Sequence, residues 1–256
     1  MTLLLKKMFD LNIKNPEEWM IWFDLDDTLW DFRLNSYLTL QEVYDFFNLE
    51  RFWKDSLIWR QVYHSVNDPL WEEYAKGLIT QKTLRKRRFY DSFIIGGMSH
   101  KEADSIAEKA DIFYLTNLGK KNSLIEGALT LLERLKNKRF KIGILSNGFS
   151  DIQQSKALSA NIFHFFDVFI TSDIYGINKP DVRLFRQAEK VAKVSAERCI
   201  MIGDNGETDI AGALKASWAS AIWFNPGHKP PGKELCMSLS ECCTLTIVNH
   251  LNQIQL

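Results

Sequence analysis

Short apolar runs recur along the chain and have the length and composition of buried strands. They are rich in Ile, Val and Phe, which is typical of strands that are covered on both faces in a parallel sheet. The runs are MIWF at 20–23, IGIL at 142–145, VFIT at 168–171, CIMI at 199–202 and SAIWF at 220–224.

Helical patterns separate the later runs. Apolar residues recur three and four positions apart, as at Ala128, Leu131, Leu132 and Leu135, which places them on one face of a helix. Strands that alternate with helices predict an α/β fold, a Rossmann-like core with a parallel sheet and right-handed crossovers.

Residues 34–114 break this alternation, because helical patterns follow one another there without a convincing strand. Gly77 is expected to end one helix and Thr80 to cap the next, and Ser99 with Glu102 has the S-x-x-E spacing of a capping box before another. The predicted organisation is an α/β core of residues 1–33 and 115–256, with an N-terminal extension at 1–19, and an inserted α-helical domain at 34–114.

The composition is that of an ordinary globular protein, with 46% hydrophobic and 25% charged residues in a chain of 256. Lys and Arg together number 32, as do Asp and Glu, so no overall charge attracts the chain to nucleic acid or anionic lipid. No apolar run is long enough for a membrane span, and the cysteines show neither a CxxC pair nor zinc-ligand spacing. We therefore expect a cytoplasmic protein without a membrane partner, and with reduced thiols at Cys199, Cys236, Cys242 and Cys243.

Polar residues follow the predicted strands at the points where the strands end. Ligands of open parallel sheets bind beyond the carboxyl ends of the strands, so these groups should converge. They are Asp24, Asp26, Asp27 and Thr28 after the first run, Ser146, Asn147 and Gly148 after the second, Lys179 and Pro180 after the third, and Gly203, Asp204 and Asp209 after the fourth.

The carboxylates of this set predict a cation site. Asp24, Asp26, Asp204 and Asp209 carry four negative charges against one positive charge on Lys179. Two like charges ~4 Å apart cost about 1 kcal/mol in water and about 4 kcal/mol at an effective dielectric constant of 20, so the set needs a cation to offset the repulsion. Oxygen ligands without a nearby His or Cys favour Mg²⁺, which commonly shares its coordination with a substrate phosphate.

The same residues have the chemistry of phosphoryl transfer. An aspartate can attack phosphorus to form an aspartyl-phosphate, and a second carboxyl two residues on can protonate the leaving oxygen and then activate water. The Ser146 hydroxyl, backbone N–H groups and Lys179 would hold the phosphoryl oxygens, because this reaction depends chiefly on positioning and charge stabilisation.

Four segments resemble, in order, the four motifs of the haloacid dehalogenase-like hydrolases. They are DLDDT at 24–28, LSNG at 145–148, NKPDVRLF at 178–185 and GDNGETD at 203–209, and the likeness covers nearly everything from residue 20 onward. The Asp at position 26 resembles the acid/base residue of the phosphatases and phosphomutases of this family. The dehalogenases of the family lack that residue. The resemblance therefore implies a Mg²⁺-dependent phosphatase in which the helical insert is a cap that closes over the site.

The resemblance also implies a role for each residue of the motifs. Asp24 would be the nucleophile and a metal ligand, Asp26 the acid/base with its backbone carbonyl on Mg²⁺, Asp204 a metal ligand, and Asp209 the residue that orients the groups around the metal. The substrate phosphate would be held by Ser146, the Asn147 backbone N–H and Lys179, which also neutralises Asp24, with Thr28 supporting the first motif.

Three further stretches resemble the branch of the family that dephosphorylates pyrimidine nucleoside monophosphates, including non-standard or damaged ones. They are VNDPLWEEYAKGLIT at 66–80, KIGILSNGFSDIQQ at 141–154 and IWFNP at 222–226. The resemblance implies a small phosphate ester, a nucleoside 5′-monophosphate, as the substrate. A sugar-phosphate phosphatase or a phosphomutase shares every catalytic residue and remains an alternative.

Two features of the insert have more than one interpretation. Trp71 and Tyr74 can stack a nucleobase, although aromatic residues on a helix more often belong to the core. The basic run from Lys82 to Arg88 suggests a non-catalytic protein that binds nucleic acid, but such a run is more often a solvated helix face. We expect no nucleic-acid partner.

One position departs from the family pattern. Relatives often place a glycine after the helix that follows the last motif, where this chain has Ser217. We therefore expect the left-handed turn that glycine favours to be altered at this position.

Overall fold

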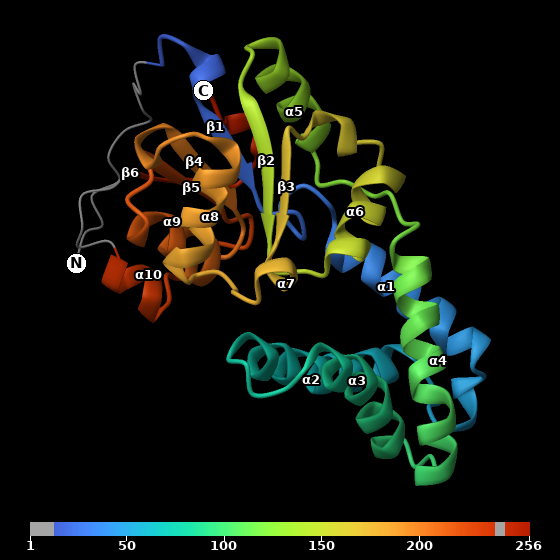
Figure 1. Ribbon diagram of the computed structural model, residues 1–256. Coiled ribbons are helices and arrows are strands. Elements are labelled where there is room, and N and C mark those ends of the chain that lie inside the picture. Colours follow the sequence, from blue (N-terminus) through green and yellow to red (C-terminus); the bar gives the residue numbers. More distant parts are fainter. Residues whose placement is uncertain (1–12, 239–243) are drawn as a thin grey trace. The chain divides into compact units, whose positions relative to one another are not determined.

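Six parallel strands form one sheet in the computed structural model, which describes residues 13–238 and 244–256 (Figure 1). Their order across the sheet is β3, β2, β1, β4, β5 and β6, so the chain starts in the middle and adds strands to one side and then to the other. This doubly wound arrangement confirms the predicted Rossmann-like α/β fold class. The strands are β1 (Met20–Phe23), β2 (Lys141–Ser146), β3 (Val168–Thr171), β4 (Cys199–Gly203), β5 (Ser220–Phe224) and β6 (Thr244–Val248).

The apolar runs of the sequence predicted β1 to β5 but not β6. This strand pairs with β5 at the edge of the sheet, and its sequence, TLTIV, alternates polar and apolar residues. Leu245 and Ile247 pack against the core while the positions before each of them are threonines, so β6 lacks the continuous apolar run by which the other five strands were recognised.

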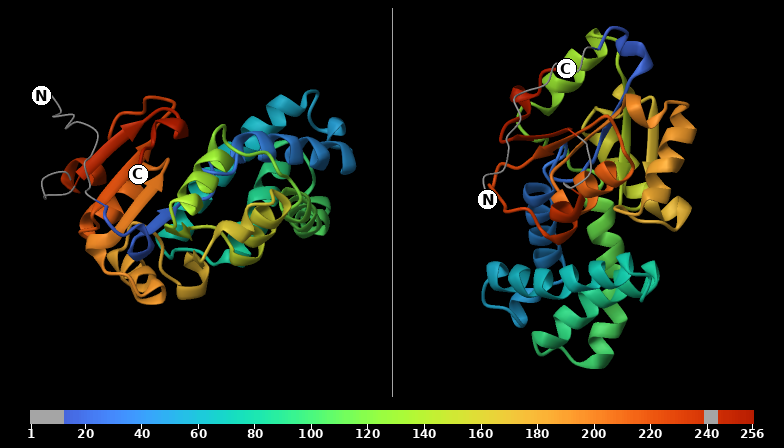
Figure 2. Two further views of the ribbon diagram at one scale, coloured as in Figure 1. Left: turned by 90° about the horizontal axis from the view of Figure 1, so that it is seen from above. Right: turned by 90° about the vertical axis from the view of Figure 1, so that its left-hand side faces the viewer.

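Helices lie on both faces of the sheet (Figure 2). On one face, helices α8 and α9 share a buried apolar cluster with side chains of β1 and β4, among them Met20, Trp22 and Met201. The α-helices of the described chain that follow residue 127 are α5 (Ala128–Asn137), α6 (Ser150–Ser159), α7 (Ser172–Tyr175), α8 (Val182–Ala192), α9 (Ala211–Lys215) and α10 (Lys233–Ser238). Shorter helical turns are η1 (Pro16–Glu18), η3 (Phe163–Phe165), η4 (Ala196–Arg198), η5 (Gly206–Ile210) and η6 (Leu251–Gln253).

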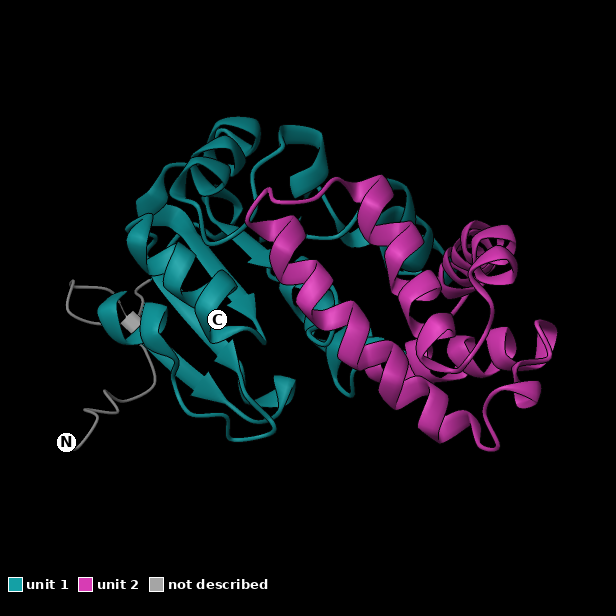
Figure 3. Ribbon diagram, turned by 90° about the horizontal axis from the view of Figure 1, so that it is seen from below, with its two compact units in different colours: residues 1–32, 122–256 teal, residues 33–121 magenta. Residues whose placement is uncertain are grey.

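The chain divides into two compact units (Figure 3). One, the α/β unit, consists of Met1–Phe32 and Asn122–Leu256, and the other, the helical insert, consists of Arg33–Lys121. Where the chain passes between them, its two passages run side by side, because the Asp31 N–H donates to the Ser123 carbonyl at 3.0 Å and the Ile125 N–H to the Leu29 carbonyl at 2.9 Å. Whether the insert acts as a cap remains a prediction.

The helices of the insert begin and end at the residues that the sequence indicated. The Thr80 hydroxyl accepts the Thr83 N–H at 3.1 Å at the start of α3, and the Ser99 hydroxyl accepts the Glu102 N–H at 3.3 Å at the start of α4. Gly77 follows α2 with a left-handed φ of 71°. The elements of this unit are α1 (Phe32–Phe46), η2 (Leu49–Arg51), α2 (Ser56–Ala75), α3 (Gln81–Ile95) and α4 (His100–Leu118).

The basic run on α3 is largely neutralised within the insert. A buried ion pair joins Arg88 to Asp111, whose other carboxylate oxygen lies 2.7 Å from Arg85. Further ion pairs join Lys86 to Asp104 and Arg87 to both Asp91 and Glu73. Ion pairs of this kind are typical of a structural helix face, and the expectation of no nucleic-acid partner remains a prediction.

The prediction of an altered turn at Ser217 was wrong. Ser217 adopts the left-handed conformation, with a φ of 54°, and its N–H donates to the Leu214 carbonyl at 2.9 Å. The following Trp218 N–H donates to the Ala213 carbonyl at 3.1 Å. These two bonds complete the Schellman motif that closes α9, so the hydrogen bonding of the turn is kept although serine replaces glycine.

Cys199 and Cys236 are free thiols, the first buried and the second exposed, whereas Cys242 and Cys243 lie outside the described residues, as do residues 1–12 of the N-terminal extension. Within the described chain no helix combines the length and the apolar character that a bilayer crossing requires.

Candidate active site

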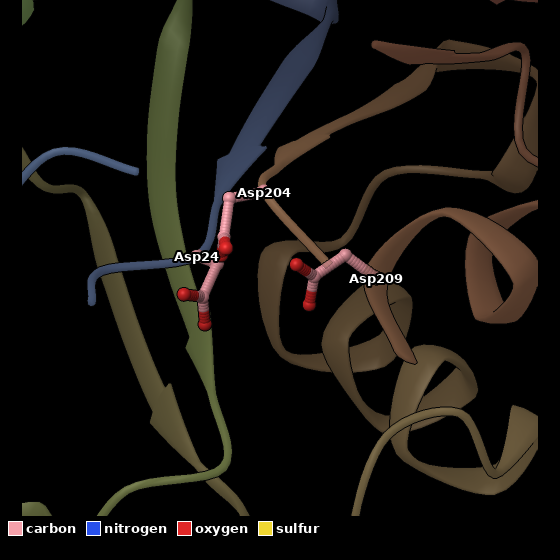
Figure 4. A group of neighbouring side chains, drawn as sticks. All are labelled: Asp24, Asp204 and Asp209. Atoms are coloured by element: carbon pink, nitrogen blue, oxygen red, sulfur yellow. The ribbon is translucent and has the colours of Figure 1, made fainter. Parts of the chain in front are cut away.

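Three carboxylates converge at the carboxyl ends of β1 and β4 (Figure 4). Asp24 follows β1, Asp204 follows β4, and Asp209 lies in the turn η5. Each offers one oxygen such that all three oxygens lie within 4.8 Å of one another. They meet because β1 and β4 are adjacent, parallel and in register, and the Asp24 N–H continues the pairing by donating to the Ile202 carbonyl at 3.0 Å.

Lys179 is buried among these groups. Its ammonium lies 2.7 Å from Asp24 Oδ1 and 2.7 Å from Asp209 Oδ1, and it donates to the Leu145 carbonyl at 2.6 Å. The Asn147 side chain fixes the backbone of Lys179 from both sides, since its amide donates to the Lys179 carbonyl at 3.1 Å and its oxygen accepts the Lys179 N–H at 2.8 Å. The chain segments after β2 and β3 are therefore joined through one asparagine.

The buried cluster has more carboxylates than ammonium groups, and the pKa values of its members reflect this imbalance. Burial raises the pKa of Asp24 well above its usual range, although the charge of Lys179 opposes this. Burial and the charge of Asp209 raise the pKa of Asp204 to about 7. Burial disfavours the charged form of Lys179, but Asp209 and Asp24 outweigh it and raise the pKa of the ammonium. One buried ammonium does not neutralise three carboxylates, so a further cation would stabilise them.

The donor set fits a magnesium ion. Asp209 is occupied by protein donors, because its Oδ1 contacts Lys179 and its Oδ2 accepts the Asn205 N–H at 3.1 Å. Asp24 Oδ2 and the Asp204 carboxylate accept no hydrogen bond from residues 13–238 or 244–256, apart from a 3.6 Å ion pair between Asp204 and the half-exposed Lys229. Oxygens of Asp24 and Asp204 are therefore left for a hard cation, with Asp209 in support.

Thr28 and Asp26 occupy the turn after β1. The Thr28 hydroxyl is fully buried and accepts the Asp204 N–H at 3.0 Å, so it ties the turn to the segment that follows β4. Asp27 has a left-handed φ of 56°, and its N–H donates to the Trp30 carbonyl at 2.8 Å. The backbone hydrogen bonds of the turn end on the carbonyls of Leu25 and Trp30, and none ends on that of Asp26.

The Asp26 carboxylate contacts two residues of α6 that were not predicted from the sequence. Lys156 lies 2.8 and 2.9 Å from its two oxygens, and the Gln153 amide donates to Oδ2 at 3.0 Å. Both residues are buried. Their spacing of three places them on one face of the helix that follows the LSNG segment, and a polar pair on a face expected to be apolar is the signal that could have found them.

Two proposed site residues belong to the other unit. Trp71 and Tyr74 lie near the end of α2, both half-buried, with their rings edge to face at a centroid distance of 5.7 Å. A role of these two side chains in choosing the substrate remains a prediction.

Comparison with known proteins agrees with this geometry. A family model described as haloacid dehalogenase-like hydrolase matches residues 20–217. The chain is 30% identical over 242 residues to the pyrimidine 5′-nucleotidase YjjG of Escherichia coli, which covers 91% of this chain and 96% of that protein. It is 40% identical over 96 residues to a glyceraldehyde 3-phosphate phosphatase of Methanothermobacter thermautotrophicus, covering 38% and 42% of the two chains.

A solved structure also matches most of the chain. The crystal structure of the HAD-hydrolase YfnB from Bacillus subtilis bound to magnesium has a TM-score of 0.77 at 26% sequence identity, and the match covers 91% of this chain and 95% of that one. With a family model that spans more than half of the sequence and a relative that matches nearly all of it, the chain belongs to the haloacid dehalogenase-like hydrolase family.

Proposed function

We propose that this hydrolase is a Mg²⁺-dependent phosphomonoesterase that acts on nucleoside 5′-monophosphates, with pyrimidine nucleotides preferred. The observation that carries the proposal is the Asp24 carboxylate, held on one oxygen by Lys179 and open on the other, beside Asp204 and two residues before Asp26. Such a carboxylate can act as a nucleophile toward phosphorus while its neighbours hold the charge.

The reaction would proceed in two steps through an aspartyl-phosphate. The Asp24 carboxylate attacks phosphorus, the ester P–O bond breaks, and Asp26 gives a proton to the leaving oxygen. Asp26 then takes a proton from water as the water oxygen attacks phosphorus, which releases inorganic phosphate and restores Asp24. Lys179 compensates negative charge on Asp24 and the phosphoryl oxygens, and the Ser146 hydroxyl donates to one of those oxygens.

A magnesium ion held by Asp24, Asp204 and the Asp26 carbonyl would supply positive charge to the transferring phosphoryl group. Among the described residues no donor contacts Asp24 Oδ2, and the Asp204 carboxylate has only the 3.6 Å ion pair with Lys229, which supports these ligands. Asp209 would keep its present partners and orient the groups around the metal.

The substrate class is supported by the relatives. The likeness to a pyrimidine 5′-nucleotidase extends over 91% of this chain, whereas the likeness to a glyceraldehyde 3-phosphate phosphatase extends over 38%. The part of the chain that would choose the substrate is the helical insert, so a match over nearly the whole length is the more informative one. A sugar-phosphate phosphatase is the second candidate, because the shorter match has the higher identity.

Phosphate release from a panel of nucleoside monophosphates and sugar phosphates, with Mg²⁺ and with EDTA, tests the proposal. We expect pyrimidine nucleotides to be hydrolysed best and EDTA to stop the reaction. Asp24→Asn should abolish turnover and leave the thermal unfolding transition in place, because the amide removes the nucleophile but keeps its shape. Faster turnover of sugar phosphates would favour the second candidate, and substantial activity of Asp24→Asn would refute the nucleophile.

A further inference from the structure

We infer that Lys156 and Gln153 are positioning residues that fix the Asp26 carboxylate for proton transfer to the leaving group. The inference rests on the proposed function, in which Asp26 is the acid and base, and it assigns a task to two residues of α6 that the four motifs do not contain. The structure joins them to Asp26 and Ser146 in one hydrogen-bond network, in which Lys156, Gln153 and Ser146 are buried and Asp26 is partly exposed.

The Lys156 ammonium is committed to Asp26. It is buried, with a side-chain exposure of 4%, and lies 2.8 Å from Asp26 Oδ1 and 2.9 Å from Oδ2. Its other neighbours are aromatic faces, since it lies 4.6 Å from the ring centre of Trp30 and 5.3 Å from that of Phe32. The rings complete the surroundings of the ammonium through cation–π contacts, so the two oxygens of Asp26 are its hydrogen-bond acceptors.

The Gln153 amide joins Asp26 to Ser146. Its nitrogen donates to Asp26 Oδ2 at 3.0 Å and to Ser146 Oγ at 2.7 Å, which uses both of its hydrogens. The carboxylate fixes the orientation of the amide, because an ionised carboxylate can only accept and would repel the amide oxygen. Gly148 leaves room for this side chain, since a Cβ atom at position 148 would lie 2.5 Å from the Gln153 amide carbon.

The same network sets the direction of the Ser146 hydroxyl. Ser146 Oγ accepts from Gln153 and from the Gly148 N–H at 3.1 Å, so both of its lone pairs are engaged. Its hydrogen must then point away from these donors and is available to a phosphoryl oxygen. Gln153 therefore connects the group that binds phosphate to the group that moves the proton.

Proton transfer explains why such a fixed carboxylate is useful. Asp26 gives its proton to the leaving oxygen as the P–O bond breaks, and it later removes a proton from water at the same place. A small displacement of a reacting group costs a large factor in rate, so two donors that hold both carboxylate oxygens would preserve the geometry through both steps. Lys156 and Gln153 transfer no proton themselves.

Leaving-group dependence of the rate tests this assignment. p-Nitrophenolate leaves without much help from an acid, whereas the 5′-oxygen of a nucleotide needs a proton. We expect Lys156→Met to lower kcat for a pyrimidine nucleoside monophosphate about 30-fold and kcat for p-nitrophenyl phosphate less than about 3-fold, since general acid catalysis contributes roughly 10²–10⁴-fold. Gln153→Met should show the same selective loss, and it keeps the inference testable if Lys156→Met does not fold.

Two controls separate positioning from stability. Lys136→Met removes a 2.7 Å ion pair with Asp167 elsewhere in the α/β unit and should leave both rates unchanged. In an Asp26→Asn background Lys156→Met should change the residual kcat for the pyrimidine nucleoside monophosphate less than about 2-fold instead of about 30-fold, because a residue that acts through Asp26 has nothing left to position.

The outcomes distinguish the two proposals. Equal losses of kcat on both substrates would overturn the positioning role, as would an increase in turnover or full additivity of Lys156→Met with Asp26→Asn. In each of these cases the wild-type enzyme would still be a phosphatase. A wild-type protein that hydrolyses neither substrate in the presence of Mg²⁺ would overturn the proposed function and the inference that rests on it.

Discussion

At the scale of single residues, the site shows how buried charge is distributed. Asp24, Asp204 and Asp209 lie close together, yet each has a different set of partners. Asp209 is satisfied by the protein, Asp24 by Lys179 on one oxygen, and Asp204 by a distant Lys229 alone among the described residues. Identical side chains thus acquire different tasks from their neighbours, as expected where environment sets acid/base behaviour.

The raised pKa of Asp204, about 7 against an ordinary 3.8, predicts how pH and metal act together. A carboxyl whose pKa is higher in the folded than in the unfolded protein makes its full contribution to stability below the unfolded-state pKa, which is near 4. This contribution is lost as the pH rises through about 7. In the proposed site Mg²⁺ would bind the ionised form and so compete with protons. We expect Mg²⁺ to raise the melting temperature, relative to EDTA, more at pH 8 than at pH 5.5.

Differential scanning fluorimetry of the wild type and Asp204→Asn provides the measurement. The variant should lose the Mg²⁺-dependent increase at both pH values. Equal increases at pH 5.5 and pH 8 in the wild type would contradict the prediction.

Ser217 carries a local cost that glycine would remove. It holds a left-handed φ of 54° at the end of α9, where a residue with a Cβ atom is disfavoured by roughly 1–2 kcal/mol. We expect Ser217→Gly to raise the free energy of unfolding by about 0.5–1 kcal/mol, measured by urea denaturation. The matched control is Ser155→Gly at an exposed position inside α6, where the same change should lower stability by about 0.5 kcal/mol.

At the scale of elements, the close packing of β2 depends on a residue without a side chain. A Cβ atom at Gly143 would lie 2.4 Å from Met20 Cε and 2.6 Å from the Trp22 ring. The methionine can move, but Trp22 is fully buried and stacks on Trp218 with ring centres 6.0 Å apart. Overpacking of such a core typically costs 1–3 kcal/mol.

Gly143→Ala is therefore expected to lower the free energy of unfolding by about 2 kcal/mol, followed by tryptophan fluorescence in urea. Gly227→Ala serves as the control, since the nearest atom to its Cβ position is 4.0 Å away. The control should change stability by less than about 0.5 kcal/mol. Similar effects of the two substitutions would show that the sheet relaxes around the added methyl group.

At the scale of the whole molecule, the insert interrupts the α/β unit at one place. The hydrogen bonds between Leu29 and Ile125 and between Asp31 and Ser123 bring the two ends of the interruption together. We expect a variant in which a short Gly/Ser linker replaces residues 33–121 to fold and to keep the Mg²⁺-dependent gain in melting temperature. Discrimination between pyrimidine and purine nucleotides should be lost.

Two results would count against that expectation. Absence of a cooperative unfolding transition would show that the α/β unit needs the insert to fold. Unchanged nucleotide discrimination would show that the insert does not choose the substrate.

The amino-acid sequence was sufficient to predict the fold class, the family and the five strands that have continuous apolar runs. It also determined the helix boundaries at Gly77, Thr80 and Ser99, because caps and left-handed turns are local features. Asp24, Lys179, Asp204 and Asp209 could be brought together from sequence alone, since each follows the carboxyl end of a strand in a parallel sheet.

The partner that each of these groups takes depends on how distant elements pack together. Strand β6 was missed because threonines separate the apolar residues, Leu245 and Ile247, that pack against the core, and Ser217 keeps a turn that its side chain disfavours because α9 must still end there. Lys156 and Gln153 are separated from Asp26 by more than a hundred residues, so their contact with it exists only once α6 packs beside the turn after β1. Local patterns are set by neighbours along the chain, whereas buried polar contacts are set by the packing of distant elements.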